Sequence, residues 1–247
     1  MSKLMPLGCK RSKTLTHLDK FPLTAATLPA KPVPLSIGVN WYENFDWPQK
    51  RSDGRWWIGR GPLGNIRGGH CVCVPSDAYT DADAWYEFYD QEQEGACVGF
   101  GTSRMMSHLN RQRYVARWLW DMAKATDEWS DTAPGDDNGT SVRAALEVLR
   151  VRGHVRWTSY LPTTTLDDYL LRDQLTPSVA QGISAYRWAT TVTMALAALQ
   201  SPRYVDLGAV PILNSWGKNY PRRVWMPLET FARLIKEDGE IGLITDR

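Results

Sequence analysis

Cys97 is the first residue whose type and setting could do covalent chemistry. It lies in DQEQEGACVGFG, where small residues precede the expected start of a helix. A thiol at a helix N-terminus is close to the positive end of the helix dipole, which favours the reactive thiolate. An inert core cysteine gives the same pattern, so the nucleophile hypothesis requires a base nearby.

Among the four histidines, His70 is the best placed to be that base. His108 lies on the same expected helix as Cys97, roughly 16 Å away along its axis at about 1.5 Å per residue. His154 follows a glycine at a helix end, where capping explains it, and His17 lies in a basic stretch. In GGHCVCV, two glycines permit another segment to approach the start of a strand closely, although a lone histidine on a strand is usually structural.

The third candidate is the sequence NSWG at 214–217. An imidazole that deprotonates a thiol must be held in one tautomer, and an asparagine oxygen that accepts its other N–H does this. Trp216 would shield that hydrogen bond from water. An ordinary Asn-Ser turn beside a core tryptophan explains the same residues equally well.

A zinc site is another possible use of the predicted histidine strand, through His70, Cys71 and Cys73. Neighbouring strand residues point to opposite faces, and the sequence offers no second ligand pair with zinc-site spacing. We therefore expect neither a metal nor another cofactor.

Four stretches together resemble the papain-like cysteine peptidases, most closely the bacterial and phage branch. DQEQEGACVGF resembles the nucleophile motif, and LNSWGKNY resembles the asparagine motif. PLSIGVNWYENF followed by GGHCVCV resembles the strand and histidine motif, and GTSVRAALEVLRVRGHV resembles the family's helix after an acidic turn. The resemblance covers roughly residues 34–246, with the histidine segment transposed ahead of the cysteine segment.

The resemblance implies a role for each matching residue. Cys97 would be the nucleophile, with His70 as general base and then general acid. Asn214 would orient His70 under the cover of Trp216, and Gln91 would donate to the oxyanion beside the Cys97 amide. Such a site implies a thiolate–imidazolium pair, in which the cysteine pKa is lowered, and a bell-shaped pH profile.

Three points qualify the resemblance. Gln93 competes with Gln91 for the oxyanion role, although Gln91 stands six residues before the cysteine, as in the family motif. Glu92 stands where the family usually has glycine, which affects the loop conformation. Many eukaryotic relatives carry a long helical inhibitory propeptide. Residues 1–33 are too short and too poor in helical pattern to form one, so we expect any restraint to lie elsewhere.

The composition fits a globular protein. The 247 residues are 43% apolar and 23% charged with a net charge of +2. These values exclude a disordered, collagen-like or coiled-coil chain and give no case for attraction to nucleic acid or membranes. Four cysteines are too few for a disulfide framework, and no apolar run is long enough for a membrane span or a secretory signal. We expect free thiols, a cytoplasmic monomer and, as one setting, a phage-encoded protein in a host cell.

The elements that must position these residues predict an α+β protein with a papain-like, two-lobed fold and the active cleft between the lobes. Residues 1–33 are expected to be a basic flexible leader before a peptidase domain at 34–247. The sheet lobe would take about 34–75 and 201–247, and the helical lobe about 96–200. The small antiparallel sheet should contain these segments: 35–42, 70–74 and 210–214. Helices are predicted in five places: GFGTSRMMSHLNR, 112–124, a segment capped by Thr140 or Ser141, 191–200, and a last helix opened by Pro227.

These predictions favour a cysteine-type endopeptidase that hydrolyses peptide bonds through a thiolate acyl-enzyme. Two alternatives stay open. One is a catalytically inactive papain-like binding or structural protein, and the other is a thiol acyltransferase or amidase with the same triad. The expected partner is an extended polypeptide, with an apolar side chain in a pocket lined by aromatics such as Trp41, Tyr42 or Trp188.

Overall fold

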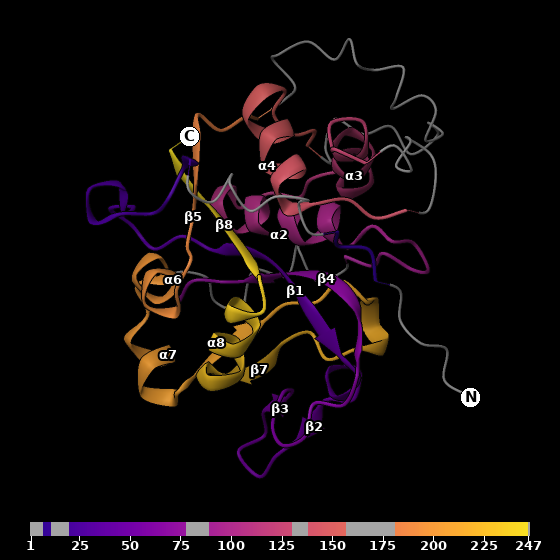
Figure 1. Ribbon diagram of the computed structural model, residues 1–247, viewed down its shortest axis with the longest axis vertical. Helices are drawn as coiled ribbons and strands as arrows, with labels where there is room; N and C mark the ends of the chain where they lie inside the picture. Colours follow the sequence, from indigo (N-terminus) through magenta and orange to yellow (C-terminus); the bar gives the residue numbers. More distant parts are fainter. Residues whose placement is uncertain (1–6, 11–19, 78–88, 130–137, 157–180, 247) are drawn as a thin grey trace.

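The first sheet of the protein has the strand order β4-β1-β8-β5, and each neighbouring pair is antiparallel. Its strands are Leu35–Tyr42 (β1), Ile66–Val74 (β4), Ala185–Trp188 (β5) and Glu240–Asp246 (β8). They belong to a computed structural model that describes residues 7–10, 20–77, 89–129, 138–156 and 181–246 (Figure 1). β1 lies inside the sheet, and all of its residues except Asn40 are buried, as expected for a strand covered on both faces.

A second sheet has the order β2-β3-β7-β6. Its strands are Gln49–Lys50 (β2), Trp56–Trp57 (β3), Ala209–Ile212 (β6) and Val224–Pro227 (β7). The β3–β7 pair is parallel and the other pairs are antiparallel. A bridge between Cys73 of β4 and Leu213 joins the two sheets, with amide–carbonyl hydrogen bonds of 3.2 and 2.9 Å.

The three segments predicted to share one sheet do lie side by side, but in two sheets. β1 pairs with β4, and β4 reaches the end of β6 only through the Cys73–Leu213 bridge. β6 forms its ladder with β7, a strand that the sequence pattern did not predict. The histidine segment therefore reaches the asparagine segment although it precedes the cysteine in the chain.

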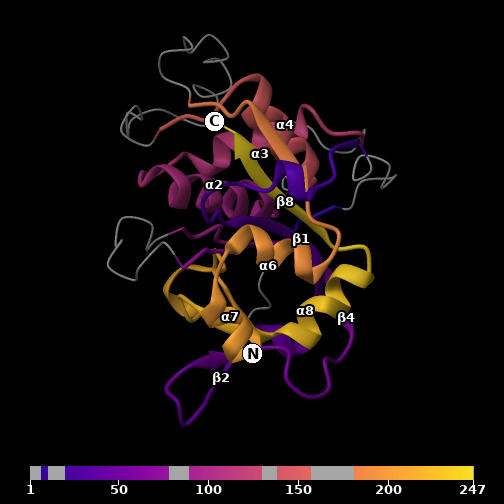
Figure 2. The same cartoon turned by 90° about the vertical axis from the view of Figure 1, so that its left-hand side faces the viewer.

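Three helices lie on the side of the first sheet that carries the predicted nucleophile. They are Cys97–Asn110 (α2), Ala116–Lys124 (α3) and Val142–Val151 (α4). Two of them pack on the sheet, and the third packs on those two. α2 packs on β4 and β1, and in Figures 1 and 2 all three gather on one side of this sheet. Ser141 caps α4, since its hydroxyl accepts from the Ala144 amide at 3.2 Å. α3 begins later than predicted because the preceding Val115 donates its amide to Val155 (3.0 Å) and adopts an extended conformation.

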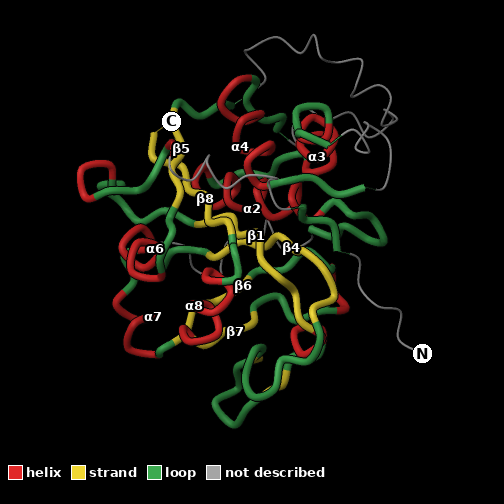
Figure 3. The backbone as a smooth tube through the Cα atoms, viewed as in Figure 1, coloured by secondary structure: helices red, strands yellow, loops and turns green. Residues whose placement is uncertain are grey.

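The remaining helices lie toward the second sheet (Figures 1 and 3). They are Val192–Leu199 (α6), Pro202–Leu207 (α7) and Leu228–Lys236 (α8), with short 3-10 turns at Ala25–Thr27 (η1), Glu43–Asp46 (η2) and Gly217–Asn219 (η6). α6 and α8 are close to their predicted positions, with Pro227 as the N-cap of α8. α7, β5, β7 and β8 were not predicted. The first three have six residues or fewer, too short to display a clear apolar period, and β8 (EIGLITD) lacks a strict alternation of apolar and polar residues.

The described part of the leader packs against this framework. Leu23 is buried, and its amide donates to the Trp188 carbonyl at 2.8 Å. Val33 donates to Ala198 at 3.0 Å. The division into leader and domain stays a prediction. In the described ranges, no helix is long and apolar enough to cross a membrane.

Candidate active site

His70 is held on β4 by two aromatic rings and by an amide from a distant segment. Its Nε2 lies 2.9 Å from Oδ1 of Asn214. Trp216 stacks on the imidazole at 4.8 Å between ring centroids and 26° between planes, while Trp41 meets it edge-on at 4.6 Å. All four residues are buried. The predicted group of His70, Asn214 and Trp216 therefore lies together, and its hydrogen bond is shielded from water.

The hydrogen bonds of Asn214 determine the tautomer of His70. Oδ1 of Asn214 also accepts from the Ser215 amide at 2.7 Å, which fixes the orientation of the side chain. Because Oδ1 can only accept, Nε2 of His70 carries the proton and Nδ1 keeps its lone pair. Among the described residues, Nδ1 has no hydrogen-bond partner. The ring thus presents a basic nitrogen on the side away from Asn214.

Cys97 is the first residue of α2 and is fully buried. Its sulfur accepts hydrogen bonds from the backbone amides of Cys71 and Gly8, and from those of Cys97 and Val98 in the first helical turn. Because Cys71 follows His70 on β4, the thiol lies beside the strand that carries the imidazole. All four cysteines are free thiols, as predicted.

Burial sets the protonation of both groups. It raises the pKa of Cys97 to about 12, more than the backbone amides lower it. It also lowers the pKa of His70 to about 4, despite the opposing hydrogen bond to Asn214. At neutral pH the structure therefore favours a neutral thiol and a neutral imidazole, instead of the expected thiolate–imidazolium pair. The physical cause is the exclusion of water from the site.

The loop before α2 places the two candidate oxyanion residues differently. Gln91 is buried, its backbone amide donates to the Ser215 carbonyl at 2.9 Å, and its Nε2 donates to the Glu94 carbonyl at 2.9 Å. Gln93 is exposed, and its side chain bonds only to the Glu92 carbonyl, at 3.3 Å. Gln91 is therefore next to the Asn214 segment, and Gln93 is on the surface.

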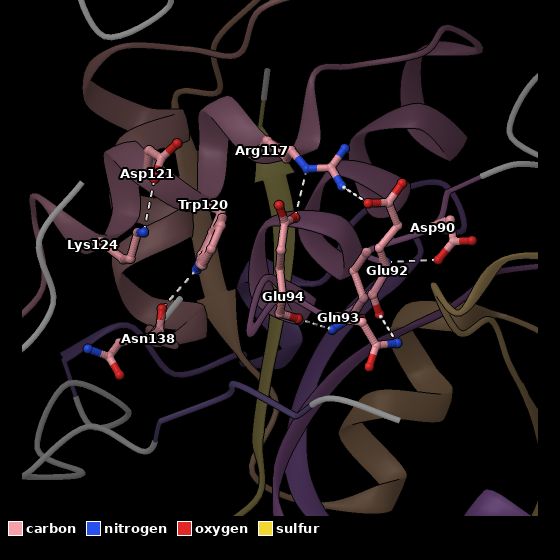
Figure 4. Close-up of polar contacts among 10 residues, drawn as sticks. Asp90, Glu92, Gln93, Glu94, Arg117, Trp120, Asp121, Lys124 and Asn138 are labelled. Carbon is pink, nitrogen blue, oxygen red and sulfur yellow. Dashed lines mark hydrogen bonds and ion pairs between the residues drawn. The ribbon is translucent and has the colours of Figure 1, made fainter. Parts of the chain in front are cut away.

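Glu92, the residue expected to affect the loop before α2, adopts a left-handed backbone conformation. Its φ is 53°, a left-handed value that costs a residue with a Cβ more than it costs glycine. Its amide donates to the Asp90 carboxylate at 2.9 Å. Arg117 on α3 lies 3.5 Å from the Glu92 carboxylate and 2.7 Å from that of Glu94 (Figure 4). These contacts stabilise the loop although Glu92, and not glycine, occupies the left-handed position.

A short part of the leader crosses the site, which the sequence did not predict. The Cys9 amide donates to the Gly69 carbonyl at 3.0 Å, and the Lys10 amide donates to the Thr140 carbonyl at 2.8 Å. Gly8, the residue before Cys9, contacts the Cys97 sulfur. The sequence analysis expected any restraint to lie outside residues 1–33, yet this part of the leader contacts the candidate nucleophile. The described residues, 7–10, bond to segments far away in the sequence, so no local pattern predicted their position.

The predicted aromatic lining is wrong. Trp41 and Trp188 are 0% exposed and Tyr42 is 4% exposed, so all three pack inside the protein. The sequence also missed a cavity of about 400 Å³ beside Asn214, whose cationic lining residues are Arg104, Lys218 and Arg222. The net charge of the whole chain, +2, gave no sign that these cationic side chains gather at one cavity. Among the described residues, no group of three or more His, Cys, Asp or Glu could hold a metal ion.

The chain is similar to a known protein in its fold and not detectably in its sequence. The sequence matches no protein-family model and no curated protein. Among solved structures, the chain is similar to xylellain, a cysteine protease from Xylella fastidiosa, with a TM-score of 0.55 and 13% sequence identity. The match covers 100% of this chain and 99% of that chain. With helices over one antiparallel sheet and a second sheet joined to its edge, the chain has a papain-like α+β fold.

Proposed function

We propose that the protein is a cysteine endopeptidase with Cys97 as nucleophile and His70 as its base. One observation carries the proposal: the 2.9 Å hydrogen bond from Nε2 of His70 to Oδ1 of Asn214, on a strand whose next amide bonds the Cys97 sulfur. A buried histidine needs only one hydrogen-bonding partner to be stable. Here the partner fixes the tautomer that a thiol-activating base requires, which supports a catalytic role.

In the proposed reaction, His70 accepts and donates protons while Cys97 forms and then loses the bond to the substrate. Nδ1 of His70 takes the proton from Cys97, and the thiolate attacks the carbonyl carbon of the scissile peptide bond. The Cys97 amide and the second N–H of the Gln91 side chain stabilise the negative charge on the oxygen. His70 then gives its proton to the leaving amine, and water hydrolyses the thioester with His70 again as base.

Trp216 and Trp41 support this cycle by keeping His70 in place. Their rings contact the imidazole on its face and its edge, so the ring cannot rotate away when it becomes charged. The two tryptophans also contact each other at 5.3 Å. Because water is excluded, the Asn214 hydrogen bond retains its strength during the reaction.

A second candidate is a papain-like protein that binds peptides without cleaving them. It is favoured by the buried, neutral state of Cys97 and His70 and by the presence of Gly8 against the sulfur. Both functions use the same peptide-binding surface, formed by the carbonyl groups of Gly69 and Thr140.

The deciding experiment is incubation of a mixed peptide library with the wild-type protein and with Cys97→Ala. Cleavage by the wild type alone supports the peptidase, and cleavage that persists in Cys97→Ala refutes it. No cleavage by either, together with retention of peptides on the protein, supports the binding function. Transfer of the acyl group to an added amine in place of water would identify an acyltransferase.

A further inference from the structure

Residues 7–10 occupy the site as an extended peptide. Their main chain is held by two hydrogen bonds on opposite walls, from Cys9 to Gly69 and from Lys10 to Thr140. Cys9 also forms a parallel bridge with Thr140. Main-chain hydrogen bonds of this kind recognise any extended peptide, so they do not explain why this sequence lies here.

The contact between Gly8 and Cys97 is unreactive. The Gly8 backbone amide donates its N–H to the sulfur. A thiolate attacks a carbonyl carbon, and an N–H directed at the sulfur presents none. The segment can therefore remain beside the nucleophile without being cleaved by this contact.

The walls beside Cys97 leave room for a main chain but for no side chain. A Cβ added to Gly8 would overlap the carbonyl oxygen of Gly95, and a Cβ added to Gly139 would overlap the carbonyl oxygen of Gly8. On the opposite wall, a Cβ added to Gly69 would overlap the Cys9 carbonyl oxygen. Gly69, Gly95 and Gly139 come from three different segments of the sequence, and the main chain of residues 8 and 9 passes close to each of them.

The neighbouring residues of the peptide have more space. Leu7 packs against the hydrophobic core, with its side chain near Gly68. The Cys9 sulfur lies over Gly38 and would be 2.8 Å from a Cβ there. Lys10 places its ammonium 5.6 Å from the ring centroid of Trp129. From these contacts, we infer the residue types that the site accepts in order: an apolar residue, a glycine, a small residue and a basic residue.

We propose that the channel beside Cys97 selects glycine at the peptide residue facing the thiol, and that the chain's own Gly8 uses this selection to keep residues 7–10 in the site. This proposal rests on the proposed function, which makes the site one that binds peptides. Its test measures alkylation of Cys97 and does not depend on peptide hydrolysis. The ligand class is an extended peptide of the form Leu-Gly-small-Lys. The specificity-determining group is the Gly95 carbonyl oxygen, which a Cβ on the facing peptide residue would overlap, while Gly139 leaves room for that residue's own carbonyl oxygen.

The first experiment measures access to the thiol. Wild type, Gly8→Leu and Gly8→Ala are treated with iodoacetamide, and alkylation of Cys97 is followed over time by mass spectrometry of the peptide that contains it. Because a side chain at position 8 overlaps Gly95, Gly8→Leu is expected to increase the rate about tenfold or more, and Gly8→Ala to increase it less. The matched control is Ala26→Leu, which introduces the same side chain at an exposed leader position and should leave the rate unchanged.

The second experiment tests selection directly. The Gly8→Leu protein is alkylated in the presence of acetyl-Leu-Gly-Ser-Lys-amide or acetyl-Leu-Ala-Ser-Lys-amide, in which serine replaces the reactive cysteine. We expect the glycine peptide to slow Cys97 alkylation and the alanine peptide to have at least tenfold weaker protection. If Gly8→Leu does not fold, Gly8→Ala serves in its place.

Each result has a defined meaning. Equal alkylation of wild type and both Gly8 variants would show that residues 7–10 do not restrict the thiol. Equal protection by the two peptides would refute glycine selection. If alkylation and protection follow the expected pattern while no variant hydrolyses any peptide, the channel proposal stands and the peptidase proposal fails.

Discussion

His70 and His154 are both fully buried and are held in nearly the same way. Nε2 of His70 lies 2.9 Å from Asn214, and Nε2 of His154 lies 2.7 Å from the Ser103 hydroxyl. Trp216 stacks on His70 at 4.8 Å, and Tyr114 stacks on His154 at 4.7 Å. Burial lowers the pKa of His70 to about 4 and that of His154 to about 3.

The surroundings of the two histidines differ. His70 is on the strand next to the Cys97 thiol, where a peptide main chain also passes. His154 lies in the protein interior, and its backbone exchanges two hydrogen bonds of 3.0 Å with Gln181. An aromatic ring and one polar partner therefore stabilise any buried histidine. His70 differs in that the next residue of its strand, Cys71, directs its backbone amide toward the Cys97 sulfur, and the main chain of Cys9 bonds to the preceding residue, Gly69.

The largest expected effect is a loss of peptide hydrolysis when His70, but not His154, is replaced. His70→Ala should reduce peptide hydrolysis by about 10²- to 10⁴-fold, since general acid–base catalysis is lost. His154→Ala should instead lower the free energy of unfolding by on the order of 2–4 kcal/mol, from lost packing and an unpaired Ser103 hydroxyl. Its folded fraction should keep normal activity. Initial rates and urea unfolding of both variants test this, and a large loss of kcat in folded His154→Ala would contradict the comparison.

The next effect concerns the loop beside the His70 site. Gln91→Ala should lower kcat by about 10²- to 10³-fold, if its side chain stabilises the oxyanion. Gln93→Ala is the matched control, because Gln93 is exposed and bonds only to a neighbouring carbonyl. Steady-state kinetics of the two variants decide the assignment. Equal kinetics would remove Gln91 from the mechanism, and a loss confined to Gln93→Ala would transfer the role.

A smaller effect is expected from the polar partners themselves. Asn214→Ala should lower kcat by about 10- to 10²-fold with little change in KM, because His70 loses its fixed orientation. Ser103→Ala removes the partner of His154 and should change only stability. The pH–rate profile adds a second measurement, since a misoriented imidazole shifts the limbs of the profile whereas a purely structural defect does not. An unchanged kcat and profile in Asn214→Ala would argue against its positioning role.

The last expected effect is a pH dependence of stability, which leaves the chemistry of the site untouched. His154 has a folded-state pKa of about 3, below its ordinary value of 6.5. Between these values the unfolded chain binds a proton that the folded protein does not, so stability falls as pH decreases, by about 1.4 kcal/mol per unit. His70 and His108, with pKa values lowered to about 4 and about 3, add to the same loss. Thermal unfolding between pH 7 and 4 should show a shallower loss in His154→Gln, and equal slopes would contradict the assignment.

The sequence by itself determined the chemical identity of the candidate site. A cysteine before an apolar-periodic helix, a histidine opening a strand and the NSWG stretch are local patterns, and local patterns depend on residues close together in the chain. The helices near 97–110, 142–151 and 228–236 follow from the same kind of information. So does the Ser141 cap, because its partner is three residues away.

Only the tertiary structure decided which of those residues lie together and which are buried. His70 and Asn214 are 144 residues apart, and no local period records their hydrogen bond. The difference between Gln91 and Gln93 depends on which side chain the fold buries, and the neutral state of Cys97 depends on the exclusion of water by distant segments. Gly8 meets Gly95 and Gly139 for the same reason. Burial and close contacts depend on segments that are distant in the sequence and come together only when the chain folds.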